Sequence, residues 1–202
     1  TGVQTCALPI SRLGLLGGAV QYLFEYPYGC LEQQSSRVLP LVVFGDYIDV
    51  FNLTSEVTNV HKCVTSYFKE WKNCQHSGGG FGYWPSSPWS DMFVSIRIAQ
   101  IYALALRHGY SKRECAIDID SLLNYIAQEI EDYNDYFRAY AYYVLALNGR
   151  HIPEGKLNAL VADERQDISV LALAGLASYA QDDQDATIAK RAAAKIRTYM
   201  RP

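Results

Sequence analysis

The helices that this sequence predicts are of two kinds, and their alternation limits the fold more than any other feature. Three segments, 93–106, 136–147 and 168–176, are apolar on nearly every helical face. A helix that is apolar all round is stable only where it is buried all round. The segments between them, such as 121–126 and 188–191, carry polar side chains on one face. Buried and half-exposed helices therefore alternate along the chain.

Apolar periodicity close to 3.6 residues runs through almost the whole chain, whereas no stretch shows sustained strand alternation. Thr54, Ser111 and Asp167 stand where helix N-caps are expected. The sequence therefore predicts an all-α fold. The predicted helices are 13–24, 32–51, 55–76, 91–108, 113–132, 135–147, 154–163, 168–180 and 186–200.

Two architectures satisfy the alternation of buried and half-exposed helices: a solenoid, or helical hairpins closed into a ring with the apolar helices inside. Solenoids usually have a fixed repeat, but the apolar helices here are unevenly spaced. We therefore favour the ring, an α/α toroid of alternating inner and outer helices.

Length and charge exclude several classes of protein. A chain of 202 residues suits one domain with its own core. Lys+Arg number 18 against Asp+Glu 21, so no basic field exists for a nucleic-acid partner. No apolar run is long enough to predict a membrane span. Residues 1–11 show no period and resemble a translated sequencing adapter, so we interpret them as a non-native leader and 12–202 as the domain.

The five cysteines do not form a recognisable framework. No CxxC pair and no Cys/His spacing typical of a metal site is present. Cys63, Cys74 and Cys115 are interpreted as buried unpaired thiols, and Cys6 falls in the leader. Neither a metal nor a cofactor is predicted. The fifth, Cys30, stands in a different context.

One segment, Tyr-Pro-Tyr-Gly-Cys-Leu-Glu-Gln at 26–33, interrupts the helical pattern. Its proline and glycine end one helix, so Cys30 lies at the entrance of the next with Gln33 three residues on. Residues at i and i+3 lie on the same face of a helix. A thiol and an amide so placed can condense into an internal thioester, with loss of ammonia. The helix N-terminus stabilises negative charge, which makes the thiolate a better leaving group.

The same segment, with Ser-Ser-Arg at 35–37 and Leu-Pro at 39–40, resembles the thioester region of alpha-2-macroglobulins and complement-like proteins. Animal members usually read GCGEQ, and CLEQ after YPYG is similar to the bacterial branch. A second block, Gly-Gly-Phe-Gly-Tyr-Trp-Pro at 79–85 before an apolar helix, resembles the glycine-aromatic loop of the same domain. The resemblance covers about 13–200 and implies an α/α toroid, here truncated.

The resemblance implies a role for each residue of the first motif. Cys30 is expected to be the thioester sulfur and Gln33 the acyl donor. Tyr26 and Tyr28 are expected to shield the thioester from water. Glu32 matches an acidic position of the motif without an assigned role.

The resemblance also implies a function, which is inhibition of endopeptidases and not catalysis. A protease cuts a bait region elsewhere in a larger protein, and one of its lysine amines is then captured covalently. Partners implied are target proteases, other domains of the same chain and a neighbouring penicillin-binding protein. The implied location is the periplasm, as a membrane-anchored lipoprotein whose anchor is not in this chain.

Two alternatives stay open. Terpene cyclases and prenyltransferases share the toroid, but Asp118-Ile119-Asp120 and the acidic run at 182–185 do not match their acidic or metal-binding motifs convincingly. The other is a helical scaffold that has lost its thioester. In complement proteins a histidine redirects the thioester toward hydroxyls, and none of the four histidines here stands in a matching context. These are His61, His76, His108 and His151.

Overall fold

A computed structural model of the chain describes residues 29–45, 59–181 and 186–200. These residues are helical apart from their connecting loops and one isolated β-bridge between Gln75 and Phe81, which confirms the all-α prediction. The α-helices are α2 (Leu31–Phe44), α3 (Val60–Trp71), α4 (Met92–Arg107), α5 (Ile119–Glu129), α6 (Asp135–Leu147), α7 (Glu154–Ala162), α8 (Ile168–Ala180) and α9 (Thr187–Tyr199), and 3-10 turns η2 (Lys72–Cys74) and η3 (Ile130–Asp132) extend α3 and α5.

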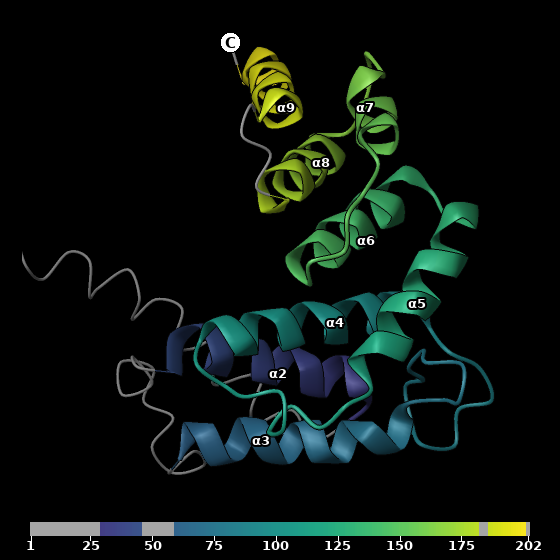
Figure 1. The fold of residues 1–202 in the computed structure, drawn as a ribbon, viewed down its shortest axis with the longest axis vertical. Coiled ribbons are helices and arrows are strands. Elements are labelled where there is room, and N and C mark those ends of the chain that lie inside the picture. Colours follow the sequence, from purple (N-terminus) through teal and green to yellow (C-terminus); the bar gives the residue numbers. More distant parts are fainter. Residues whose placement is uncertain (1–28, 46–58, 182–185, 201–202) are drawn as a thin grey trace, which may run out of the picture.

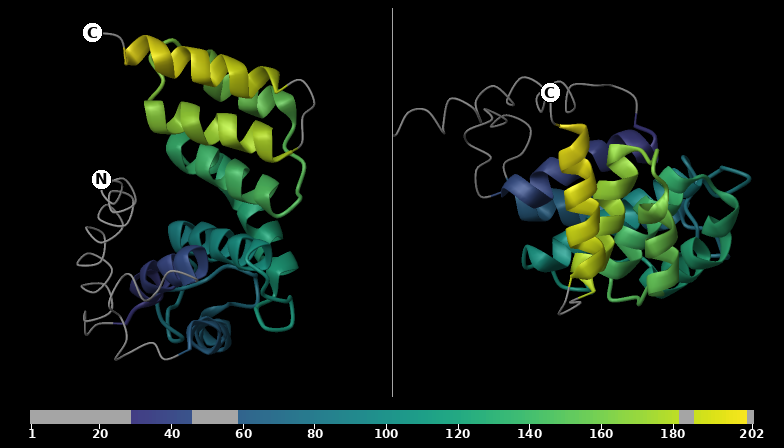
Figure 2. Two further views of the ribbon diagram at one scale, coloured as in Figure 1. Left: turned by 90° about the vertical axis from the view of Figure 1, so that its left-hand side faces the viewer. Right: turned by 90° about the horizontal axis from the view of Figure 1, so that it is seen from above.

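Every second helix of the chain belongs to one inner row, and the others pack around it (Figure 1). Helices α2, α4, α6 and α8 pack one against the next and form the inner row, and α2 and α8 lie at its opposite ends. Helices α3, α5, α7 and α9 follow them in alternation and pack outside. Figure 2 shows the same helices stacked as an arc. The predicted alternation of inner and outer helices is therefore present in the described residues.

Burial follows the two kinds of helix. Ten of the sixteen residues of α4 and eight of the thirteen of α6 are buried, against three of eleven in α5. Helix α8 buries six of thirteen residues, although Ile168, Leu176 and Tyr179 are exposed. Helix α9 buries only Ile188 and Ala192. The three apolar helices are thus more buried than their outer neighbours, as predicted.

A truncated ring is expected to expose apolar surface at its C-terminal edge, around 188–200, but the structure places most of that surface elsewhere. Ile188 is buried because α9 packs its apolar face against α8 and α7. Only Tyr199 and Met200, at the end of α9, are exposed large apolar residues there. The remaining exposed apolar side chains at this end belong to α8, whose sequence is apolar on all sides.

Several helix boundaries differ from the prediction. The helix predicted at 113–132 begins at Ile119 with Asp118 as its N-cap, because Ser111 and Glu114 close a separate turn through two hydrogen bonds of 2.8 and 2.6 Å. Helix α3 begins at Val60, and the side chain of Asn59 caps it over 2.8 Å. The proposed cap Thr54, the predicted helix at 13–24 and residues 1–11 lie outside the described residues.

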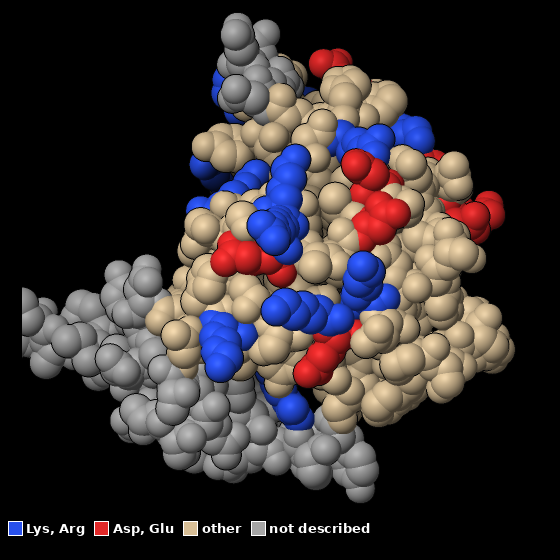
Figure 3. Space-filling model, turned by 60° about the horizontal axis from the view of Figure 1, so that its bottom comes forward, with Lys and Arg blue, Asp and Glu red and all other residues tan. Residues whose placement is uncertain are grey.

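In the part of the chain that the structure describes, no helix is long and apolar enough to cross a membrane. Charged side chains of both signs are interspersed on the face drawn in Figure 3. The division into a leader at 1–11 and a domain at 12–202 remains a prediction.

Candidate functional site

The first turn of α2 brings Cys30 and Gln33 together. Cys30 is the N-cap residue, with the extended backbone angles (φ −63°, ψ 159°) that such residues adopt. Its side chain lies against the backbone N–H of Gln33, and its own N–H donates to Oε1 of Gln33 over 3.3 Å. This reciprocal arrangement is a capping box. The thiol and the side-chain amide therefore lie over the same turn, at a helix end that favours negative charge.

Gln34, the next residue, fastens this turn to α3. Its Nε2 donates to the carbonyl oxygen of Gly29 over 2.7 Å, and its Oε1 accepts from Nε1 of Trp71 over 2.9 Å. Trp71 is fully buried and packs edge-on against Phe68, with ring centroids 5.0 Å apart. The residue before Cys30 is thus tied to the hydrophobic core through one side chain.

A loop of glycine and aromatic residues between η2 and α4 also contacts the turn. The N–H of Leu31 donates to the carbonyl oxygen of Tyr83 over 2.9 Å. The loop is tightly folded. A Cβ atom added at Gly80 would lie 2.6 Å from Cβ of Ser90, and one added at Gly82 would lie 2.5 Å from Cβ of Ser87. Only glycine fits at these two positions.

Tyr83 lies close to the Cys30–Gln33 turn. Burial, followed by the carboxylates of Asp91 and Glu32 and by the Cys30 thiol, raises the pKa of the Tyr83 hydroxyl. The tyrosine therefore stays neutral at physiological pH and can act as a hydrogen-bond donor. It is 38% exposed, and Trp84 and Trp89 of the same loop are 49% and 73% exposed. Tyr83 is thus a partly exposed aromatic residue beside the turn.

The predicted site residues are placed as follows. Cys30 and Gln33 are in contact at the start of α2. The main-chain carbonyl of Glu32 accepts from the hydroxyl of buried Ser35 over 2.6 Å. Tyr26 and Tyr28 lie outside the described residues, so their shielding role remains a prediction.

Three residues of this site did not emerge from the sequence as functional candidates. Tyr83 belongs to the glycine-aromatic block, but no pattern indicates that it lies beside Cys30. Gln34 follows Gln33 directly, and that adjacency was the only available signal. Trp71 is 37 residues away from Gln34, and no sequence pattern predicts their hydrogen bond.

The histidines occupy different surroundings. His61 lies on α3, stacks on Tyr110 and contacts Glu114 over 2.7 Å. His108 is the C-cap of α4, and His151 lies in the loop between α6 and α7. His76 lies in the glycine-aromatic loop, where its Nδ1 is 2.9 Å from Oγ of Ser90.

The remaining thiols of the described residues are unpaired. Cys74 and Cys115 are buried as predicted, whereas Cys63 is only half-buried. Burial, with a smaller effect of Glu114, raises the pKa of the Cys115 thiol to about 12. Such a thiol is a poor nucleophile at neutral pH.

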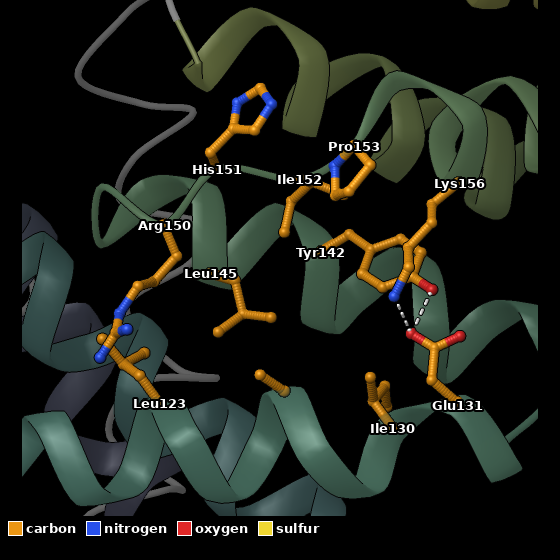
Figure 4. A pocket seen from close by; sticks show the side chains of 11 residues that line it. Leu123, Ile130, Glu131, Tyr142, Leu145, Arg150, His151, Ile152, Pro153 and Lys156 are labelled. Atoms are coloured by element: carbon orange, nitrogen blue, oxygen red, sulfur yellow. Dashed lines mark hydrogen bonds and ion pairs between the residues drawn. The ribbon is translucent and has the colours of Figure 1, made fainter.

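A cavity of about 340 Å³ lies elsewhere, between α5, α6 and the loop that precedes α7 (Figure 4). Its wall is mainly apolar, and Glu131 at its rim binds Lys156 over 2.5 Å and the hydroxyl of Tyr142 over 2.9 Å. None of the predicted site residues lines it.

Within the described ranges, no cluster of three His, Cys, Asp or Glu side chains could hold a metal ion. Asp118 and Asp120 lie at the start of α5, and the acidic run at 182–185 is outside these ranges.

Three bacterial proteins named alpha-2-macroglobulin or alpha-2-macroglobulin homolog are similar in sequence to this chain. The Yersinia pestis protein is 30% identical over 142 residues, the Thermotoga maritima protein 28% over 139, and the Rickettsia conorii protein 27% over 150. These matches cover 68–69% of this chain but only 7–8% of each relative. No protein-family model matches the chain.

A solved structure extends the similarity to the fold. The crystal structure of native alpha-2-macroglobulin from Escherichia coli, spanning domain MG7 to the C-terminus, superposes with a TM-score of 0.67. The match covers 94% of this chain and 30% of that chain at 20% identity. The chain therefore has homologues named alpha-2-macroglobulin at modest identity, and it shares its fold with part of the Escherichia coli protein.

Proposed function

We propose that this chain is part of an alpha-2-macroglobulin-type inhibitor, in which Cys30 and Gln33 form an internal thioester that captures proteases covalently. The observation that carries the proposal is the reciprocal contact at the start of α2, where the Cys30 side chain and the Gln33 side chain share one helical turn. The names of the relatives support the family, and the motif at 26–33 supports the chemistry.

The thioester forms by attack of the Cys30 sulfur on the amide carbon of Gln33. A C–S bond forms, the C–N bond breaks, and ammonia leaves with the proton of the thiol. The capping box holds the two groups in one turn, which replaces a bimolecular encounter by an intramolecular one. Positive potential at the helix N-terminus favours the negative charge that develops on the sulfur when the C–S bond breaks.

Capture reverses the roles of these groups. A primary amine, such as a lysine side chain of an attacking protease, adds to the acyl carbon. An amide bond to Gln33 forms, the C–S bond breaks, and the Cys30 sulfur takes up the proton lost by the amine. The product is stable, so each molecule reacts once, and the protein acts as a stoichiometric inhibitor and not as an enzyme.

We further propose which other domains the full-length protein has and where in the cell it acts. A bait region and further domains of the same chain expose the thioester after cleavage. The protein acts in the periplasm as a membrane-anchored lipoprotein, in the neighbourhood of a penicillin-binding protein. These points rest on the resemblance of the motif at 26–33 to the bacterial branch of the family.

Thiol labelling of the full-length protein tests the thioester. Native Cys30 is expected to resist iodoacetamide and to become reactive after methylamine, with methylamide found at Gln33 by peptide mapping. Gln33→Glu is the matched control, because its carboxylate does not condense with the thiol and leaves Cys30 free. Wild-type Cys30 that is alkylated as fast as in Gln33→Glu, with Gln33 unmodified, would refute the proposal.

A further inference from the structure

The peptide group between Gly29 and Cys30 is held at both of its ends by consecutive glutamine side chains. Its N–H donates to Oε1 of Gln33 over 3.3 Å, and its C=O accepts from Nε2 of Gln34 over 2.7 Å. In a planar trans peptide the C=O and N–H point in opposite directions. Fixing the carbonyl of Gly29 therefore fixes the direction of the Cys30 N–H.

Gln34 can hold this carbonyl because its own orientation is fixed. The indole of Trp71 is only a donor, so it selects Oε1 of Gln34 over 2.9 Å and leaves the NH₂ group for Gly29. A buried indole N–H needs such a partner. Trp71 is fully buried at the end of α3, so the chain of hydrogen bonds begins in the rigid core.

The Cys30 N–H points at the oxygen that becomes charged in the chemistry proposed above. When sulfur or an amine adds to the Gln33 acyl carbon, negative charge develops on its oxygen. A backbone N–H held in place near that oxygen stabilises the tetrahedral intermediate. The same donor serves thioester formation and thioester opening, because both pass through such an intermediate.

We propose that Gln34 is a positioning residue of the thioester site, which holds the Gly29–Cys30 peptide so that the Cys30 N–H stabilises the oxyanion on Gln33. The inference rests on the proposed function. Gln34 does not touch the reacting atoms. It acts through one peptide group, and Trp71 acts through Gln34.

The variants Gln34→Glu and Trp71→Phe of the full-length protein test this role. Glutamate keeps the shape and can still accept from Trp71, but its carboxylate cannot donate to Gly29. Phenylalanine removes the indole donor and leaves Gln34 free to turn. Two quantities are measured: the fraction of molecules that carry the thioester, from intact mass, and the rate of methylamine opening per thioester formed. We expect both variants to lower the opening rate about ten- to a hundredfold.

Phe68→Leu is the control for a purely structural effect. Phe68 is fully buried and packs against Trp71, so its truncation loosens the same core without removing a hydrogen bond of the chain. If Phe68→Leu lowers the melting temperature about as much as Gln34→Glu and Trp71→Phe do, it is still expected to keep the wild-type rate of methylamine opening. An equal fall in Phe68→Leu, or a wild-type rate in Gln34→Glu and Trp71→Phe, overturns the positioning role alone. Wild-type protein without the thioester mass overturns the proposed function, and with it this inference.

Discussion

The backbone N–H of Leu31 donates to the carbonyl oxygen of Tyr83 over 2.9 Å, which joins the start of α2 to a loop more than fifty residues later in the chain. Two glycines of that loop allow its backbone to fold tightly. Gly80 and Gly82 allow the loop backbone to lie close to Ser90 and Ser87, and the carbonyl group of Tyr83 reaches the start of α2. The conformation of the loop therefore bears directly on the candidate site.

We expect Gly82→Ala to destabilise the protein, because the added methyl group would lie 2.5 Å from Cβ of Ser87. Overpacking of this kind usually costs about 1–3 kcal/mol. Gly78→Ala is the matched control in the same loop, since an added Cβ there meets nothing within 4 Å. Urea denaturation measures both. Equal stability of the two variants would mean that the close approach at Gly82 does not constrain the loop.

The burial of α8 predicts unequal effects on stability for two of its leucines. Leu171 is fully buried, whereas Leu176 is 45% exposed. Leu171→Ala is expected to lower the free energy of unfolding by about 2–5 kcal/mol, because it leaves a cavity between packed helices. Leu176→Ala is expected to change it by less than about 1 kcal/mol. A large loss in Leu176→Ala in the full-length protein would show that another segment covers this face of α8.

The Glu131 carboxylate provides a test by pH. Its hydrogen bond to Lys156, and after it that to Tyr142, lowers its pKa from 4.5. A carboxyl group whose pKa is lowered in the folded state stabilises the protein at pH values above its pKa in the unfolded chain, here 4.5. That contribution is lost as pH falls through the lowered pKa. Because Glu131 is partly exposed, Glu131→Gln should lower the free energy of unfolding at pH 7 by less than about 1 kcal/mol.

The measurement for Glu131→Gln is urea denaturation from pH 7 down to pH 3, with Glu129→Gln as a control on the same exposed segment. The difference from wild type should shrink as pH falls below 4.5. If Glu131→Gln is less stable than wild type by the same amount at every pH in this range, the substitution acts through packing and not through the charge of Glu131.

Much of the fold could be predicted because its signals are local. The bounds predicted for α6 and α8 are those of the structure, since an Asn or Asp cap starts each helix and Asn148-Gly149 ends α6. The start of α5 was wrong because the turn from Ser111 to Glu114 is fixed in part by His61, a residue far away in sequence. Local periodicity carries no information about such a contact.

In the candidate site, too, the local contacts could be predicted from the sequence and the tertiary contacts could not. The spacing of Cys30 and Gln33 within one helical turn was enough to predict their contact. The hydrogen bond from Trp71 to Gln34 and the proximity of Tyr83 depend on how α3 and the glycine-aromatic loop pack against α2. These are tertiary contacts, and a single sequence without the fold does not predict them.

Nucleophile choice is expected to favour amines over hydroxyls. A neutral amine attacks a thioester directly, whereas a hydroxyl needs a general base or an acyl intermediate. The measurement is a competition between glycerol and methylamine after protease activation of the full-length protein, with both adducts quantified on Gln33. A majority of ester would show that a histidine, such as His76 in the glycine-aromatic loop or His151, takes part in the reaction.

The central claim is that Cys30 and Gln33 are joined, and intact mass spectrometry of the native full-length protein tests it most directly. The expected mass is about 17 Da below that of the encoded mature chain, which corresponds to the loss of one ammonia. Cys30→Ser and Gln33→Glu are expected to have the full mass calculated for their own sequences. A native protein with the full encoded mass, in a preparation not exposed to amines, would contradict it.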